Sequence, residues 1–204
     1  MSISLTKSSV INLSKQVPGL SKVVVGLGWD PVGADEKKGF FGRILGGSTP
    51  GPNIDCDAAA ILLSNGVAGD RDTVYFGNLR HNSGSVVHSG DNLTGEGDGD
   101  DEQIIVNLKD VPSKYDKIIL FVNIYRGKEK GQTFSKIKNA FVRIVDASNN
   151  KEICRYDISN TKEYSDVVTM TFGELIKVNG EWEFRAVGEP HSAQSISVYS
   201  ANYR

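Results

Sequence analysis

A series of about nine short runs of apolar or alternating residues most restricts what this chain can fold into. Turn-forming residues separate the runs, and Asn149-Asn150 and Asn179-Gly180 indicate hairpins because Asn and Gly accept the positive φ of tight turns. Many short strands with Gly-rich turns favour an all-β, two-sheet antiparallel β-sandwich with one or two short helices over an α/β enzyme. The runs are residues 23–25, 58–63, 74–76, 104–108, 117–124, 140–145, 153–158, 167–172 and 182–187.

Two segments depart from the strand pattern. A short helix is expected from Thr133 to about Asn139, because Thr133 can cap the free main-chain amides of a first turn. Residues 31–53 are rich in Gly and Pro and predict a long insertion loop. Its bulky segment, residues 40–45, either packs within the loop or docks a partner. We expect the whole chain, residues 1–204, to form a single domain.

Charge and composition narrow the function classes. The 23 basic and 25 acidic residues leave a net charge of −2, which gives no electrostatic footprint for nucleic acid or an anionic membrane. The N-terminus lacks a basic start with an apolar run, and no stretch approaches the roughly 20 apolar residues that span a bilayer. A cytoplasmic protein without membrane insertion is therefore expected. Cys56 and Cys154 predict free thiols in a reducing compartment, with Cys56 in the core.

Residues 91–102 carry six carboxylates, three glycines and no basic side chain. Because crowded like charges repel, such a cluster is either fully solvated or gathered around a cation. Glycines that alternate with acids let the backbone curl and aim oxygens inward, and hard oxygen ligands favour Ca²⁺, or less readily Mg²⁺. An EF-hand is excluded, since Leu93 and Gly95 occupy positions that need side-chain oxygens. Residues 85–88 and 103–108 flank the stretch as strands, so we predict a metal loop between two strands.

A second group of ligands is expected at the start of another strand. Asp55 and Asp57 precede and open the run at residues 58–63, and alternation along a strand places them on one face while Cys56 and Ala58 face the core. The two carboxylates form half of a metal cup that the acidic loop would complete. The alternative interpretation, in which both residues only cap main-chain amides near a turn, stays open.

The chain resembles the TerD family of bacterial tellurium-resistance and general-stress proteins over nearly its whole length. The resemblance rests on residues 26–30, 54–58 and above all 90–102, with further similarity at 84–88, 133–134 and 139–140. It implies a two-sheet β-sandwich that binds Ca²⁺, typically two ions, in an acidic cup, and cytosolic partners such as the tellurite-resistance proteins TerB and TerC. It supplies no established catalytic activity.

Carried over to this sequence, the resemblance implies metal ligands from the strand and from the loop. Asn78, Thr94 and main-chain carbonyls of the loop are weaker candidates, and the role of Asp30 is left undecided. The ligands implied are Asp55, Asp57, Asp91, Asn92, Asp98, Asp100, Asp101 and Glu102.

Three other chemistries remain as alternatives. A metal-dependent hydrolase would use the acidic cup to clamp substrate oxygens while a metal-bound water attacks. Tellurite handling by thiols would rest on Cys56 and Cys154, which lack a CxxC spacing. A zinc site is disfavoured because the three histidines have no zinc-ligand spacing, and hydrogen-bonding roles in turns or at the surface are expected of them. They are His81, His88 and His191.

Overall fold

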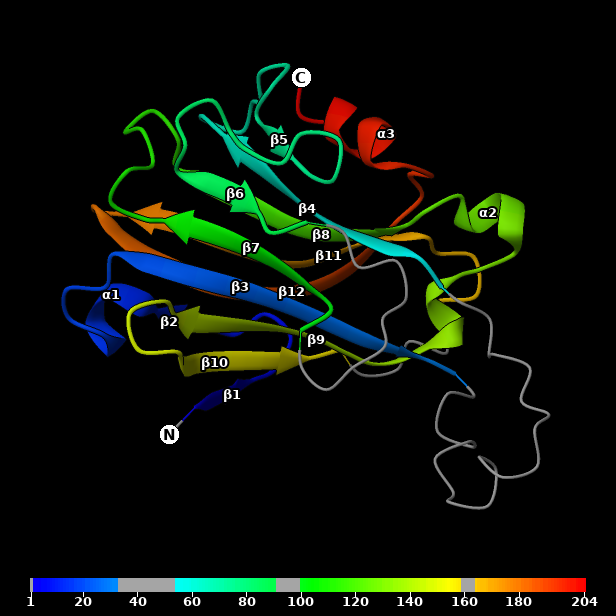
Figure 1. Ribbon diagram of the computed structural model, residues 1–204, viewed down its shortest axis with the longest axis horizontal. Helices are drawn as coiled ribbons and strands as arrows, with labels where there is room; N and C mark the ends of the chain where they lie inside the picture. The colour runs from blue at the N-terminus through cyan, green and yellow to red at the C-terminus, as the bar shows by residue number, and fades with distance from the viewer. Residues whose placement is uncertain (1, 33–53, 91–99, 159–163) are drawn as a thin grey trace.

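The computed structural model describes residues 2–32, 54–90, 100–158 and 164–204, and these residues form two six-stranded sheets (Figure 1). In spatial order, sheet A consists of β1 (Ile3–Leu5), β10 (Lys151–Asp157), β9 (Ile137–Asp146), β3 (Lys22–Pro31), β7 (Glu102–Asn107) and β6 (Val86–His88). Sheet B consists of β2 (Val10–Asn12), β12 (Glu181–His191), β11 (Thr169–Val178), β8 (Lys117–Ile124), β4 (Cys56–Leu63) and β5 (Thr73–Val74). Among these strand pairs only β1 and β10 run parallel. The predicted two-sheet β-sandwich is confirmed.

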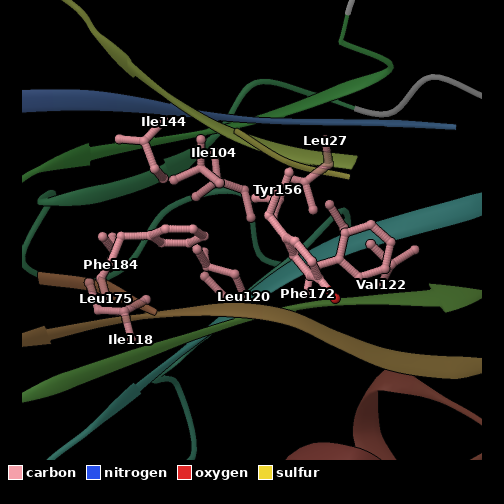
Figure 2. Close-up of a cluster of buried hydrophobic side chains, with 14 of the residues drawn as sticks. Leu27, Ile104, Ile118, Leu120, Val122, Ile144, Tyr156, Phe172, Leu175 and Phe184 are labelled. Atoms are coloured by element: carbon pink, nitrogen blue, oxygen red, sulfur yellow. The ribbon is translucent and has the colours of Figure 1, made fainter. Parts of the chain in front are cut away.

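The main core lies between the two sheets. Figure 2 shows Leu27 and Ile104 of sheet A pointing toward Leu120 and Phe184 of sheet B. The alternation that predicted the strands explains this arrangement, because every second residue of a strand faces the same side. Cys56 and Cys154 are both free thiols, as the sequence predicted, and Cys56 lies in the core as expected; Cys154 is buried there too.

Strand β4 is buried on both faces along its entire length. Cys56 and Ala58 face the main core, whereas Ala59 and Ile61 belong to a second apolar cluster on the outer face of sheet B. Helix α3 (Ile196–Ala201) lies over that outer face and contributes to the second cluster. The part of β4 from Ala58 onward is therefore held between two packed layers.

Three short α-helices occur in the described residues, α1 (Leu13–Gln16), α2 (Gly127–Lys130) and α3, one more than the upper number predicted. The helix predicted from Thr133 to Asn139 is wrong. Only one 3₁₀ turn forms there, at Phe134–Lys136, and the Thr133 side chain makes no capping bond. Ile137 already begins β9, because the following residues alternate into the core and pair with β3, which outweighs a weak local helix signal.

The hairpin turns are confirmed, and two terminal strands were missed. Asn150 lies between β9 and β10 at a φ of 58°, and Asn179 and Gly180 lie between β11 and β12 at 51° and 84°. Strands β1 and β2 have three residues each, which is too short to display a period. The predicted insertion loop begins at residue 31, which still belongs to β3, and its residues 33–53 lie outside the described residues.

The parts of the chain that the structure describes contain no helix with the length and apolar character needed to cross a membrane.

Candidate metal centre

In the described residues, the end of the acidic stretch meets the start of β4. Glu102 is the first residue of β7, and its Oε2 accepts a short hydrogen bond from the main-chain N–H of Ala58 in β4. Nε2 of His88, in the neighbouring strand β6, lies 3.4 Å from the same Oε2, and both side chains are fully buried. The end of the acidic stretch is therefore joined to the strand that carries Asp57, across the interface between the sheets.

Asp101 is anchored to β3. Its main-chain N–H donates to the carbonyl of Leu27 at 2.8 Å, and its Oδ2 accepts from the main-chain N–H of Trp29 at 2.7 Å. Burial raises the pKa of Asp101 to about 6; the Trp29 bond opposes this rise, while nearby Asp30, Asp100 and Glu102 add to it. The negative charge in this region is crowded, which is the situation that a bound cation relieves.

Asp100 lies on the outer face of sheet A and forms an ion pair with Arg143. Arg143 in β9 donates from Nε to Oδ1 at 2.6 Å and from a terminal nitrogen to Oδ2 at 3.1 Å, and Gln103 donates to Oδ2 at 3.0 Å. The carboxylate lies directly over the Cα of Gly26, where a Cβ would overlap it. Glycine is needed at this position because the close approach leaves no room for a side chain.

Asp55 and Asp57 lie on either side of the buried Cys56. Oδ2 of Asp55 lies 3.9 Å from Nζ of Lys130 at the end of α2, while Asp57 is 3% exposed. Burial raises the pKa of the Cys56 thiol well above its ordinary value, and the carboxylates of Asp57, Glu102, Asp55 and Asp101, in that order, raise it further. Four of the predicted ligands thus act on one buried thiol.

The same electrostatics weaken the proposal of thiol chemistry. Burial, with a smaller effect from Glu152, raises the pKa of Cys154 to about 12. A thiol with a raised pKa stays protonated at neutral pH, and the thiolate is the reactive form. Both cysteines therefore behave as apolar core residues in this structure.

The structure tests the predicted ligand set only in part. Asp91, Asn92, Thr94 and Asp98 lie outside the described residues. Within the described segments, no group of three or more His, Cys, Asp or Glu side chains is placed to hold a metal ion. The ligand assignment therefore stays a prediction.

The weaker ligand candidates have other contacts. Asn78 donates through Nδ2 to the carbonyl of Thr73 at 2.7 Å, and Asp30 accepts from Nδ2 of Asn139 at 2.8 Å. Asn78 thereby closes the turn after β5, and Asp30 joins β3 to β9. These contacts give both residues a structural role.

Sequence reasoning missed two residues that contact this region, His88 and Arg143. His88 alternates inward with Val86, so the strand pattern could have indicated that it is buried. Arg143 gave no signal, because a basic residue at an outward position of a strand is ordinary. The hydrogen-bonding role expected of histidines is observed for His81, whose Nε2 lies 3.1 Å from Asp72, and for His191, whose Nε2 lies 2.8 Å from the Thr171 hydroxyl.

Comparisons with known proteins cover nearly the whole chain. A model of the TerD domain matches residues 1–201. The stress response protein SCP2 of Bacillus subtilis (strain 168) is 47% identical over 190 residues, which cover 93% of this chain and 92% of that protein. The tellurium resistance protein TerD of Serratia marcescens is 44% identical over 200 residues, which cover 97% and 95%.

A solved structure supports the fold independently of close sequence similarity. The crystal structure of a homologue of telluride resistance protein (TerD) from Streptomyces coelicolor A3(2) superimposes with a TM-score of 0.64 at 20% identity. The superposition covers 89% of this chain and 96% of that one.

Proposed function

The chain belongs to the TerD domain family, and from this premise we propose that it binds Ca²⁺ and uses the ion to shape a docking surface for other stress-response or tellurite-resistance proteins. The observation that supports the proposal is the hydrogen bond between Glu102 and the N–H of Ala58. This bond holds the end of the acidic stretch against β4, which contains Asp57 and directly follows Asp55. Residues that are 44 positions apart are thereby brought into one region.

The donor set suits a hard cation. The predicted ligands are carboxylates and one amide, and oxygen atoms of these kinds are what Ca²⁺ takes, six to eight at a time. Burial is the main cause of the raised pKa of Asp101, and the neighbouring carboxylates of Asp30, Asp100 and Glu102 add to it. The residues that would hold about two ions are Asp55, Asp57, Asp91, Asn92, Asp98, Asp100, Asp101 and Glu102.

The guanidinium of Arg143 and a bound Ca²⁺ ion would compete for the carboxylate of Asp100. The bidentate contact occupies both carboxylate oxygens of Asp100, so this residue can bind an ion only by sharing or releasing the guanidinium. Ca²⁺ binding would then draw the negative charge of Asp100 away from Arg143 on the outer face of sheet A and toward the metal. In the proposed function, this exchange changes the surface that a partner meets.

The proposal on partners and location rests on the resemblance to the family and not on contacts in this chain. We propose that the protein works in the cytoplasm with TerB-like proteins and a TerC-like membrane protein, without inserting into the membrane itself. We propose no catalytic step, and a metal-dependent hydrolase would need coordination positions open to substrate.

Calorimetric titration of chelator-stripped protein with Ca²⁺, and separately with Mg²⁺, tests the proposal. We expect saturable Ca²⁺ binding, a weak response to Mg²⁺, and a stability gain of about 2.7 kcal/mol per site at roughly 100 times Kd. Asp101→Asn keeps an oxygen for the N–H of Trp29 but removes a charge, and we expect at least about tenfold weaker Ca²⁺ binding.

Asp110→Asn is the matched control, because Asp110 is exposed and follows the far end of β7. This variant should bind Ca²⁺ as the wild type does. A protein that takes up no Ca²⁺, or an Asp101→Asn variant that binds it with unchanged affinity, would contradict the proposal.

A further inference from the structure

A cavity of about 530 Å³ opens on the outer face of sheet B, beside α3. Its walls come from the start of β4, from β5 and the turn after it, from the end of β8 and from α3. The volume lies within the range of about 300–1,000 Å³ that small-molecule sites occupy. The residues of the cavity that carry the argument are Asp57, Arg71, Phe76, Asn78, Asn123 and Tyr125.

Two buried residues that line this cavity provide hydrogen-bond acceptors. Asp57 and Asn123 are register partners on β4 and β8, and each is 3% exposed. Nδ2 of Asn123 donates to the carbonyl of Val168 at 3.0 Å and to the Thr169 hydroxyl at 2.7 Å. A carbonyl can only accept, so the nitrogen of this amide is identified and its oxygen remains as an acceptor. Asn78 has the same arrangement, because its Nδ2 donates to the carbonyl of Thr73.

Aromatic rings form one wall. Phe76 packs edge-on against Tyr75 and Tyr125, with ring centroids 5.2 Å and 6.1 Å apart. Phe76 and Tyr125 stay more than a third exposed, so these contacts leave much of their ring surface open. Aromatic faces attract ammonium and guanidinium groups, and Nζ of Lys130 already lies 5.2 Å from the Tyr125 ring centroid. A carboxylate, amide oxygens and aromatic rings together favour a cationic nitrogen group.

The mouth of the cavity has the opposite charge. Arg71 is exposed, and Arg204 is 49% exposed with one nitrogen 3.5 Å from Asp70. Two arginines against one acid at the entrance repel a purely cationic ligand and attract an anionic group. A ligand that fits both the buried acceptors and the positively charged mouth needs a positive end and a negative end.

We infer that this cavity binds a small zwitterion of the amino-acid class, with its ammonium group at Asp57 and Asn123 and its carboxylate at Arg71. The inference needs no bound metal, although Asp57 is also one of the predicted Ca²⁺ ligands. A Ca²⁺ ion that drew on Asp57 would weaken the ammonium end, so the two sites would be coupled through one carboxylate.

Four small probes separate the two charged ends. L-Norvaline and 5-aminovalerate have the same atoms with different charge separation, whereas pentylamine and valerate each retain only one charge. Each is titrated into ¹⁵N-labelled full-length protein, once in chelator and once in Ca²⁺, while amide signals of Thr73, Asn123 and Ser200 are followed. We expect at least one zwitterion to give saturable shifts there, at least about tenfold tighter than pentylamine or valerate.

The inference is overturned if neither zwitterion gives saturable shifts at these amides in either buffer, or if pentylamine or valerate binds as tightly. Because the chelator arm contains no Ca²⁺, a protein that fails to bind Ca²⁺ in the calorimeter leaves this result unaffected. The two proposals can therefore fail separately.

Matched variants locate the site without disturbing the core. Arg71→Gln and Phe76→Ala alter exposed residues of the cavity, and each should weaken the zwitterion at least about threefold. Arg80→Gln and Leu79→Ala change an exposed arginine and an exposed large apolar residue nearby that do not line the cavity. Equal losses in both pairs, or none in the first pair, would overturn the assignment.

Discussion

The two sheets each contain six strands in the described residues, yet their outer faces differ. On sheet A the outer face carries ion pairs, including Arg143 with Asp100 and Glu152. On sheet B, around β4 and β8, the outer face carries a second apolar cluster in which the Phe121 and Tyr199 rings lie 4.5 Å apart. Burial therefore dominates on sheet B around β4, although sheet B also carries ion pairs of Glu174 with Lys117 and Arg185.

The strand sequences explain which sheet is covered. All eight residues of β4 are buried, whereas β7 alternates between buried and half-buried positions. A continuous apolar run indicates a strand covered on both faces, and alternation indicates one exposed face. The difference places the cavity beside α3, where the outer face of sheet B is covered, and places the Arg143 ion pairs on the open face.

Removing a ring from the covered face should have the largest effect on stability. We expect Phe121→Ala to lower the free energy of unfolding by about 3–5 kcal/mol, because the side chain of Phe121 in β8 is fully buried under α3. Urea unfolding measures this loss.

Ile105→Ala is the matched change on the open face, where Ile105 is half-buried. It should cost about 1–2 kcal/mol, because less apolar surface leaves water there on folding. Equal losses in the two variants would show that both faces are equally buried in solution and would remove the contrast.

A smaller effect on stability is expected at Gly26, where the Asp100 carboxylate lies against the open face of sheet A. Gly26→Ala introduces a Cβ that overlaps the Asp100 carboxylate, so we expect a loss of about 1–3 kcal/mol by urea unfolding. The loss should come from the overlap rather than from the strand, since alanine itself is not worse than glycine within a strand.

An Asp100→Ala background separates these two causes. Without the carboxylate, the added Cβ has room, and Gly26→Ala should then be nearly neutral. An equal cost in both backgrounds would mean that Asp100 does not lie over Gly26 in solution.

The sequence predicted the sandwich because its evidence was repeated across many segments. Each of the predicted runs overlaps a strand, although the run at residues 74–76 shares only Val74 with β5, and the Asn179-Gly180 turn forms as expected. The helix at Thr133 failed because it rested on a single capping residue, and pairing of β9 with β3 outweighed it. Repeated patterns were reliable, whereas isolated local signals were not.

The candidate centre was predictable only as two separate halves. Alternation correctly placed Cys56 and Ala58 toward the core, but the hydrogen bond from Ala58 to Glu102 joins strands of different sheets and has no local signature. The Arg143 contact with Asp100 is hidden for the same reason. Contacts between sheets depend on how the whole chain folds, and neither composition nor period specifies them.

The smallest effect is expected from a substitution of Arg155, which forms an ion pair on the open face of sheet A. Its guanidinium carbon lies 3.6 Å from the Phe141 ring centroid, and its Nε donates to Asp157 at 2.7 Å. Exposed contacts of both kinds are weak, so Arg155→Ala should cost about 0.5–1 kcal/mol by urea unfolding. Arg155→Lys keeps the charge opposite Asp157 but loses the flat stacked group, and it should recover only part of the loss. A cost near that of Phe121→Ala would mean that charge stabilises the open face as strongly as burial stabilises the covered one.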